Sequence, residues 1–211
     1  MIEAGGGNAA IIQADLGQEQ SLSGLVDKAS KALGRELTVL VNNAASFVPD
    51  TVATADSTSW KTNLSINLRA PFFLSQAFAN QIPEGCRANI INIIDQKVLR
   101  LTPEMLSYTV SKSALWTLTQ LLAQALAPNV RVNAIGPGPT LKSIYQSDEK
   151  FAAEAASVPL GTGPALEEIV KGIEFILNMP SMTGQMLALD GGQHLAWHRD
   201  NHVTPRQEGD A

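Results

Sequence analysis

The sequence is poor in the residues that build disulfide frameworks and metal sites. It has one cysteine, Cys86, and three histidines among 211 residues. A single cysteine cannot form an internal disulfide, so we expect a protein of a reducing compartment, the cytoplasm. His, Cys, Asp and Glu nowhere cluster with the spacing of metal ligands, and we therefore expect no metal site.

Basic charge and long apolar runs are scarce as well. The chain has 15 basic and 20 acidic residues, a net charge of −5, and its basic residues are scattered. This argues against nucleic acid and anionic membrane surfaces as partners. No apolar run approaches the roughly 20 residues of a membrane span, and the N-terminus lacks the basic and apolar regions of a signal peptide. We expect a globular protein that binds neither nucleic acid nor membrane.

What the chain does have is an alternation of short apolar runs with longer helical patterns. Five runs are candidate strands, at 10–14, 38–41, 88–94, 130–135 and 186–189. Four segments between them have helical periodicity, at 21–33, 58–81, 107–126 and 166–178. This alternation predicts an α/β fold with a doubly wound parallel sheet. We expect a single domain over residues 1–197 and a polar C-terminal tail at 198–211.

Tyr108 and Lys112 are the clearest candidates for chemistry. Four residues apart, they share one face of the predicted helix. A protonated lysine beside a phenol favours its ionised form, so we expect Lys112 to lower the pKa of Tyr108 and prepare it as an acid or base. Asp95 ends an apolar strand, at the edge where open α/β sheets bind ligands. A carboxyl group there can accept from Tyr108 and help relay a proton to a ring nitrogen.

Motifs around these residues follow the order and spacing of a known family. They are Asn42-Asn43-Ala44-Ala45, Asn67-Leu-Arg-Ala-Pro71, Tyr108-Thr-Val-Ser-Lys112 and Val130-Arg-Val-Asn-Ala-Ile-Gly-Pro-Gly138. With them, residues 9–197 resemble the short-chain dehydrogenase/reductase family. That family normally has serine at the position of Asp95. An aspartate there, with Phe47 just after the Asn-Asn-Ala motif, is similar to the pteridine reductase branch.

The resemblance implies a Rossmann-type fold and a catalytic set. The cofactor would be NADP(H), and the reaction would reduce a dihydropterin or dihydrofolate to its tetrahydro form. Tyr108 with Asp95 would supply the proton, and Lys112 would also hydrogen-bond the nicotinamide ribose. Asn67 would kink its helix and position a water behind the lysine. Phe47 would stack on the flat ring, and Asp95 and Tyr108 would also contact it.

The resemblance also implies where the cofactor lies. Asn43 and Ala44 would pass beneath the adenosine ribose, and Asp15 would hold the adenine. The loop Gly136-Pro137-Gly138, with Thr140, would contact the carboxamide and the phosphates. Related reductases also lead us to expect a homo-oligomer, either a dimer or a tetramer.

A glycine-rich turn is missing at the front. Gly5-Gly6-Gly7 lacks the G-x-G-x-x-G spacing, and a predicted strand rather than a helix follows it. By the family pattern, run 10–14 resembles the third strand, so two strands and their helices, about 50 residues, are absent. Run 38–41 would then be an exposed apolar edge. We favour a fragment over a rearranged fold; a soluble, cooperatively unfolding monomer would contradict this.

Two alternatives stay open. The chain could reduce another carbonyl or an imine, with Asp95 in place of the usual serine by drift. It could also be a truncated, non-catalytic subunit, because NADPH should bind poorly without its phosphate anchor. The preference for NADPH over NADH comes from the branch alone, since the residues that would read the 2′-phosphate belong largely to the absent segment.

Overall fold

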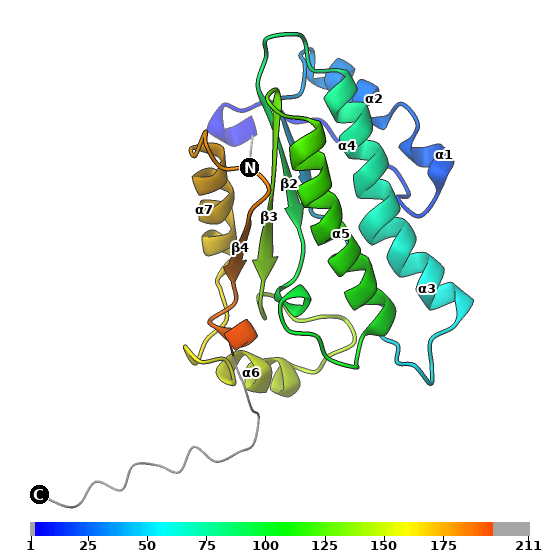
Figure 1. Ribbon diagram of the computed structural model, residues 1–211, viewed down its shortest axis with the longest axis vertical. Coiled ribbons are helices and arrows are strands. Elements are labelled where there is room, and N and C mark those ends of the chain that lie inside the picture. Colours follow the sequence, from blue (N-terminus) through cyan, green and yellow to red (C-terminus); the bar gives the residue numbers. More distant parts are fainter. Residues whose placement is uncertain (1–2, 196–211) are drawn as a thin grey trace, which may run out of the picture.

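A parallel sheet forms the centre of the molecule. The computed structural model describes residues 3–195. Four parallel strands lie in the order β1-β2-β3-β4 (Figure 1). They are β1 Val39–Asn42, β2 Ala88–Ile93, β3 Val130–Pro137 and β4 Met186–Leu189. Four of the five predicted strands and the α/β class are thereby confirmed. The predicted tail and the predicted domain end at residue 197 lie outside the described residues.

Helices cover both faces of the sheet. The long helix α5, Leu106–Ala125, and α4, Ala70–Asn80, pack on one face, and α7, Leu166–Leu177, packs on the other (Figure 1). The buried hydrophobic residues form separate clusters. Ile90 packs in one that includes Phe78 of α4, Ile91 packs in another that includes Ile176 of α7, and both are fully buried. The continuous apolar run of β2 is therefore explained by burial on both sides.

Two predicted helices are built from shorter pieces. Segment 21–33 is split into α1, Glu19–Leu22, and α2, Leu25–Leu33, because Gly24 between them has a positive φ of 66°. Segment 58–81 is one helical stretch whose middle, Ser65–Arg69, is π-helical (η2) between α3, Ser57–Leu64, and α4. Single π-turns of this kind are frequent at functional sites.

Some elements have no strong periodicity and were not predicted. They are α6, Asp148–Ala156, and three 3₁₀ turns, η1 Glu3–Gly5, η3 Gln96–Val98 and η4 Gln193–Leu195. Helix α6 contains no buried residue. A helix without an apolar stripe gives no pattern for sequence reasoning to detect. It lies beyond the carboxyl ends of the strands, at the bottom of Figure 1.

The predicted strand at 10–14 is wrong. This segment has no strand pairing, and Ile11 is 99% exposed. Strands exist through hydrogen bonds to a neighbour, and no described strand pairs with the outer side of β1. Val39 and Val41 on β1 are 40% and 38% exposed, which confirms the expected apolar edge.

Candidate active site

Tyr108 and Asp95 meet at the carboxyl edge of the sheet. Asp95 lies two residues after the end of β2, and Tyr108 lies in the first turn of α5. The Tyr108 hydroxyl donates to Asp95 Oδ2 at 2.8 Å, while Asp95 Oδ1 accepts the Lys97 N–H at 2.8 Å. The strand end and the helix start thus bring together the two groups that sequence analysis paired.

The electrostatics of this pair differ from expectation. Burial raises the pKa of Tyr108 well above its usual value, and the charge and hydrogen bond of Asp95 raise it further. Burial also raises the pKa of Asp95, against hydrogen bonds from Lys97 and Tyr108 that lower it. The expectation that Lys112 lowers the pKa of Tyr108 is wrong for this arrangement. Tyr108 holds its proton at neutral pH, as a proton donor must.

Lys112 is buried one turn further along α5. Its side chain is 2% exposed, and Nζ donates to the Ile93 carbonyl oxygen at 2.8 Å. Nζ lies 5.8 Å from the centroid of the Tyr108 ring. Burial lowers the pKa of Lys112 to about 8, although the charge of Asp95 acts in the opposite direction. The lysine is therefore protonated at neutral pH but close to losing its charge.

Phe47 lies directly against the candidate proton donor. Its ring centroid is 4.4 Å from that of Tyr108, and the planes meet at 74°, an edge-to-face contact. Sequence analysis predicted that Phe47 contacts the substrate, and the fold brings its ring against Tyr108 from the loop after β1.

Asn67 holds the loop that carries Phe47. It lies in the π-helical turn and is 1% exposed. Its side-chain amide hydrogen-bonds both backbone polar groups of Ser46. Its Oδ1 accepts the Ser46 N–H at 2.7 Å, and its Nδ2 donates to the Ser46 carbonyl at 2.9 Å and to Ser111 Oγ at 2.9 Å. Both amide hydrogens of Asn67 are thus used inside the protein.

Most of the predicted cofactor residues lie at the carboxyl ends of β1 and β3. Asn43 and Ala44 follow β1 and are exposed. Asp15 is exposed and accepts the Gly17 N–H at 2.8 Å. Gly136 lies beside Asp95, since a Cβ on it would meet the Asp95 carbonyl carbon at 3.5 Å. Thr140 turns its hydroxyl back to the Gly138 carbonyl at 3.0 Å.

Gly138 has a packing reason to be glycine. A Cβ there would lie 2.7 Å from Asp190 Cα, too close for any side chain. Sequence analysis expected the backbone of the Gly-Pro-Gly loop to approach a ligand closely. At Gly138 the backbone instead approaches Asp190 of the same chain.

The donors present suit one end of a nicotinamide nucleotide. A protonated amine has three N–H donors, and Lys112 gives one of them to Ile93. The others can serve ribose hydroxyls. For the phosphates, the glycine-rich Gly5-Gly6-Gly7 offers no helix N-terminus, because Gly5 ends a 3₁₀ turn and residues 7–15 form neither helix nor strand. Among the described residues, the fit is thus to the nicotinamide half.

Sequence analysis missed three buried polar residues beneath this site. They are Asp50, Asn63 and Ser107, with exposures of 3%, 0% and 0%. A signal existed for Asn63, which lies four residues before Asn67 in the same predicted helix. Asparagine is unfavourable in helix interiors, so two of them at this spacing indicate a shared side-chain task.

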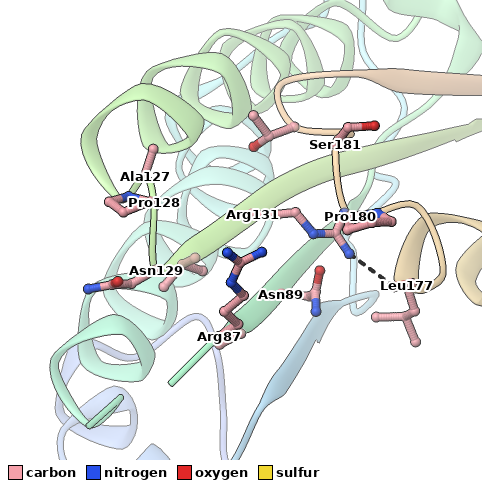
Figure 2. A pocket seen from close by; sticks show the side chains of 12 residues that line it. Arg87, Asn89, Ala127, Pro128, Asn129, Arg131, Leu177, Pro180 and Ser181 are labelled. Atoms are coloured by element: carbon pink, nitrogen blue, oxygen red, sulfur yellow. Dashed lines mark hydrogen bonds between the residues drawn. The ribbon is translucent and has the colours of Figure 1, made fainter. Parts of the chain in front are cut away.

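The opposite end of the sheet contains a separate hollow. A cavity of about 400 Å³ lies at the amino ends of β2 and β3 and is lined by Arg87 and Arg131, among others (Figure 2). Arg131 donates to the carbonyl oxygens of Ile176, Leu177 and Met182, at 3.0, 3.1 and 2.8 Å. Its guanidinium therefore serves the end of α7, and we assign this hollow no chemistry.

Within residues 3–195, no three His, Cys, Asp or Glu side chains are placed to hold a metal ion. Over the same residues, no helix is long and apolar enough to cross a membrane.

Comparison with known proteins gives relatives along nearly the whole chain. The sequence profile of the family described as "Enoyl-(Acyl carrier protein) reductase" matches residues 1–194. A solved structure of FolM alternative dihydrofolate reductase 1 from Brucella suis, in complex with NADP, superposes with a TM-score of 0.90. It is 44% identical, over 94% of this chain and 79% of that one.

More distant relatives divide between substrates. Dihydromonapterin reductase from Citrobacter koseri is 28% identical over 190 residues, which is 89% of this chain and 78% of the relative. "Probable galactose dehydrogenase GalD" from Rhizobium meliloti is 32% identical over 188 residues, 86% of this chain and 73% of the relative. The chain therefore belongs to the short-chain dehydrogenase/reductase family, and its likeness to the dihydrofolate and dihydromonapterin reductases supports the pteridine reductase-like branch.

Proposed function

We propose that the protein reduces a dihydropterin or dihydrofolate to the tetrahydro form with NADPH. The observation that carries this proposal is the 2.8 Å hydrogen bond from the Tyr108 hydroxyl to Asp95, with the Phe47 ring against Tyr108. A carboxyl group paired with a phenol suits protonation of a ring nitrogen, and an aromatic wall suits a flat heterocycle. The likeness to a dihydrofolate reductase that binds NADP supports the same substrate and cofactor.

The residues divide the work between holding and protonating. Bound NADPH would supply the hydride that a C=N bond of the substrate accepts. Lys112 would hold the nicotinamide ribose, Asn43, Ala44 and Asp15 the adenosine, and loop 136–140 the carboxamide and phosphates. Phe47 would stack on the substrate ring.

Tyr108 supplies the proton. Its raised pKa keeps the hydroxyl protonated until the ring nitrogen accepts that proton. Asp95, whose pKa is raised by burial, holds a proton nearer to neutral pH than an exposed aspartate does. It can therefore return a proton to the Tyr108 oxygen. Asn67 supports this arrangement by fixing the loop beside the ring.

The experiment is NADPH consumption with a dihydropterin, followed by absorbance. We expect turnover in the wild type, loss of about 10²- to 10⁴-fold in Tyr108→Phe, and a clear loss in Asp95→Ser. Unchanged pterin turnover in Asp95→Ser would remove the role given to Asp95. If the wild type neither consumes nor binds NADPH, the chain is a non-catalytic subunit rather than a reductase.

A second candidate is reduction of another carbonyl, which the likeness to the galactose dehydrogenase favours. Aldehydes, ketones and sugar lactones assayed beside pterins separate the two. A preference for any of these over pterins, by kcat/KM, decides for this candidate.

We also propose that the protein is a homo-oligomer of the cytoplasm. The exposed apolar edge at Val39 and Val41 and the single cysteine support these two statements.

A further inference from the structure

A second asparagine, Asn63, lies one helical turn before Asn67 and makes the same pair of hydrogen bonds to a backbone segment. Asn63 Oδ1 accepts the Val48 N–H at 3.2 Å, and its Nδ2 donates to the Val48 carbonyl at 3.0 Å and to Ser107 Oγ at 2.8 Å. Asn63 and Asn67 thus hold Val48 and Ser46, on either side of Phe47. Each also donates to a serine of α5.

The spacing of the two grips follows from helix and strand geometry. Four helical residues rise about 6 Å, and two extended residues span about 6.7 Å. Alternate residues of an extended segment direct their backbone N–H and C=O groups to the same side. Both amides can therefore bind the segment like a neighbouring strand, which fixes the backbone of Phe47 between them.

Asp50 joins this loop to the start of α5. Its carboxylate accepts the Ser107 N–H at 2.9 Å, the Ser107 hydroxyl, and the Ser59 hydroxyl at 3.0 Å. Met105, at the N-cap position of α5, provides no side-chain cap. Asp50 therefore caps α5 from a distant loop, one residue before Tyr108. Burial raises the pKa of Asp50, but hydrogen bonds from Ser107 and Ser59 outweigh it and hold that pKa below its usual value.

We propose that Asn63, Ser107 and Asp50 are positioning residues that fix Phe47 edge-on to Tyr108 and so set the orientation of the aromatic ring that would stack on a flat heterocycle. The inference rests on the proposed function for the identity of the ligand. The hydrogen bonds of Asn63 and Asp50 to Val48 and Ser107, here called the clamp, are a property of the chain itself. They can be measured without ligand.

The first measurement is backbone hydrogen exchange. We expect Asn63→Ala to speed exchange at the Val48 amide by roughly tenfold or more, the loss of one buried hydrogen bond. The matched control is Asn133→Ala. Asn133 is equally buried and grips another loop, through the Met182 carbonyl and the Gln185 N–H, at 2.9 and 3.0 Å. Wild-type protection of Val48 in Asn63→Ala would overturn the clamp.

The second measurement is a double-mutant cycle between Asn63 and Phe47, using Kd and KM for a pterin. We expect Asn63→Ala to weaken pterin binding about tenfold, with a smaller change in kcat. In the Phe47→Ala background the same change should have no further effect, because Asn63 acts through that ring. A purely structural role gives independent, multiplicative effects and would overturn the proposal.

A replacement variant and a ligand-free readout cover the two ways in which these measurements could fail. Should Asn63→Ala not fold, Ser107→Ala replaces it, since it keeps the Ser107 N–H bond to Asp50 and removes only the two hydrogen bonds of the hydroxyl, to Asn63 and to Asp50. Should the wild type bind no pterin, the proposed function fails, and hydrogen exchange alone decides whether the clamp exists.

Discussion

Three ionisable side chains, Asp95, Tyr108 and Lys112, share one site that is buried from water. Asp95 and Tyr108 have raised pKa values, and that of Lys112 is lowered to about 8, with burial as the largest cause in every case. Holding a charge in such a place costs stability and is kept where chemistry requires it. Lys112 is the group for which this cost can be measured most directly.

We predict that Lys112→Met abolishes turnover and stabilises the protein by about 1–3 kcal/mol at pH 7, because a buried charge is replaced by an apolar chain. The folded pKa of about 8 lies below the unfolded value of 10.5. The unfolded chain therefore binds more protons between these values, and wild-type stability rises with pH across this window. The advantage of the variant should shrink accordingly, as measured by urea unfolding at pH 7 and pH 10. A variant less stable than wild type at pH 7 contradicts this account.

The same pKa predicts the alkaline limb of the rate profile. As pH rises through about 8, Lys112 loses its charge, and we expect kcat/KM to fall because the ammonium no longer holds its ligand. The profile of kcat/KM from pH 6 to 10 is the measurement. A profile that stays flat across pH 7–9 would show that Lys112 does not titrate there.

At the scale of single elements, a side chain of one element can hydrogen-bond the terminal backbone groups of another. Arg131 of β3 donates to carbonyl groups at the end of α7, as Figure 2 shows for Leu177. The last carbonyl groups of a helix have no intrahelical partner. A strand residue therefore completes the helix that covers the second face of the sheet.

We predict that Arg131→Met destabilises the protein by about 1–3 kcal/mol, since the Leu177 carbonyl oxygen loses the guanidinium donor and those of Ile176 and Met182 lose one of their donors. Arg87→Met is the control, because Arg87 lines the same cavity but is exposed. Its charge also lowers the pKa of Arg131, after burial as the larger cause. Chemical denaturation should leave Arg87→Met at or slightly above wild-type stability. Equal losses in both variants would assign the effect to charge rather than to the helix end.

For the whole molecule, the strand order leaves β1 at the edge of the described sheet, with one side unpaired. Strand β1 pairs only with β2 among the described strands, and Val39 and Val41 are partly exposed on it. An unpaired apolar edge is a template for association with another chain.

We predict that the protein self-associates through this edge, so that its sedimentation coefficient rises with concentration. Val41→Lys should shift the distribution to smaller species, because a lysine on an edge strand opposes pairing. Val52→Lys is the control, since Val52 is 84% exposed but lies in a loop. A monomer at all concentrations would contradict both this prediction and the proposed oligomer.

Local pattern was enough for much of the fold and the site. Strand–helix alternation predicted β1 to β4 and helices α5 and α7, and the pairing of Asp95 with Tyr108 followed from strand end and helix start. The strand at 10–14 failed because a strand is defined by its neighbour. Helix α6 was missed because it buries no residue.

The class of fold, the family and the contact between Asp95 and Tyr108 could be predicted from the sequence, since periodicity and motifs are local properties of the chain. The remaining features depend on contacts between distant segments. Asn63 and Ser107 lie 44 residues apart and become partners only in the folded chain. The direction of the Tyr108 pKa shift depends on burial beside Asp95, because desolvation acts on a group only once the surrounding chain has excluded water.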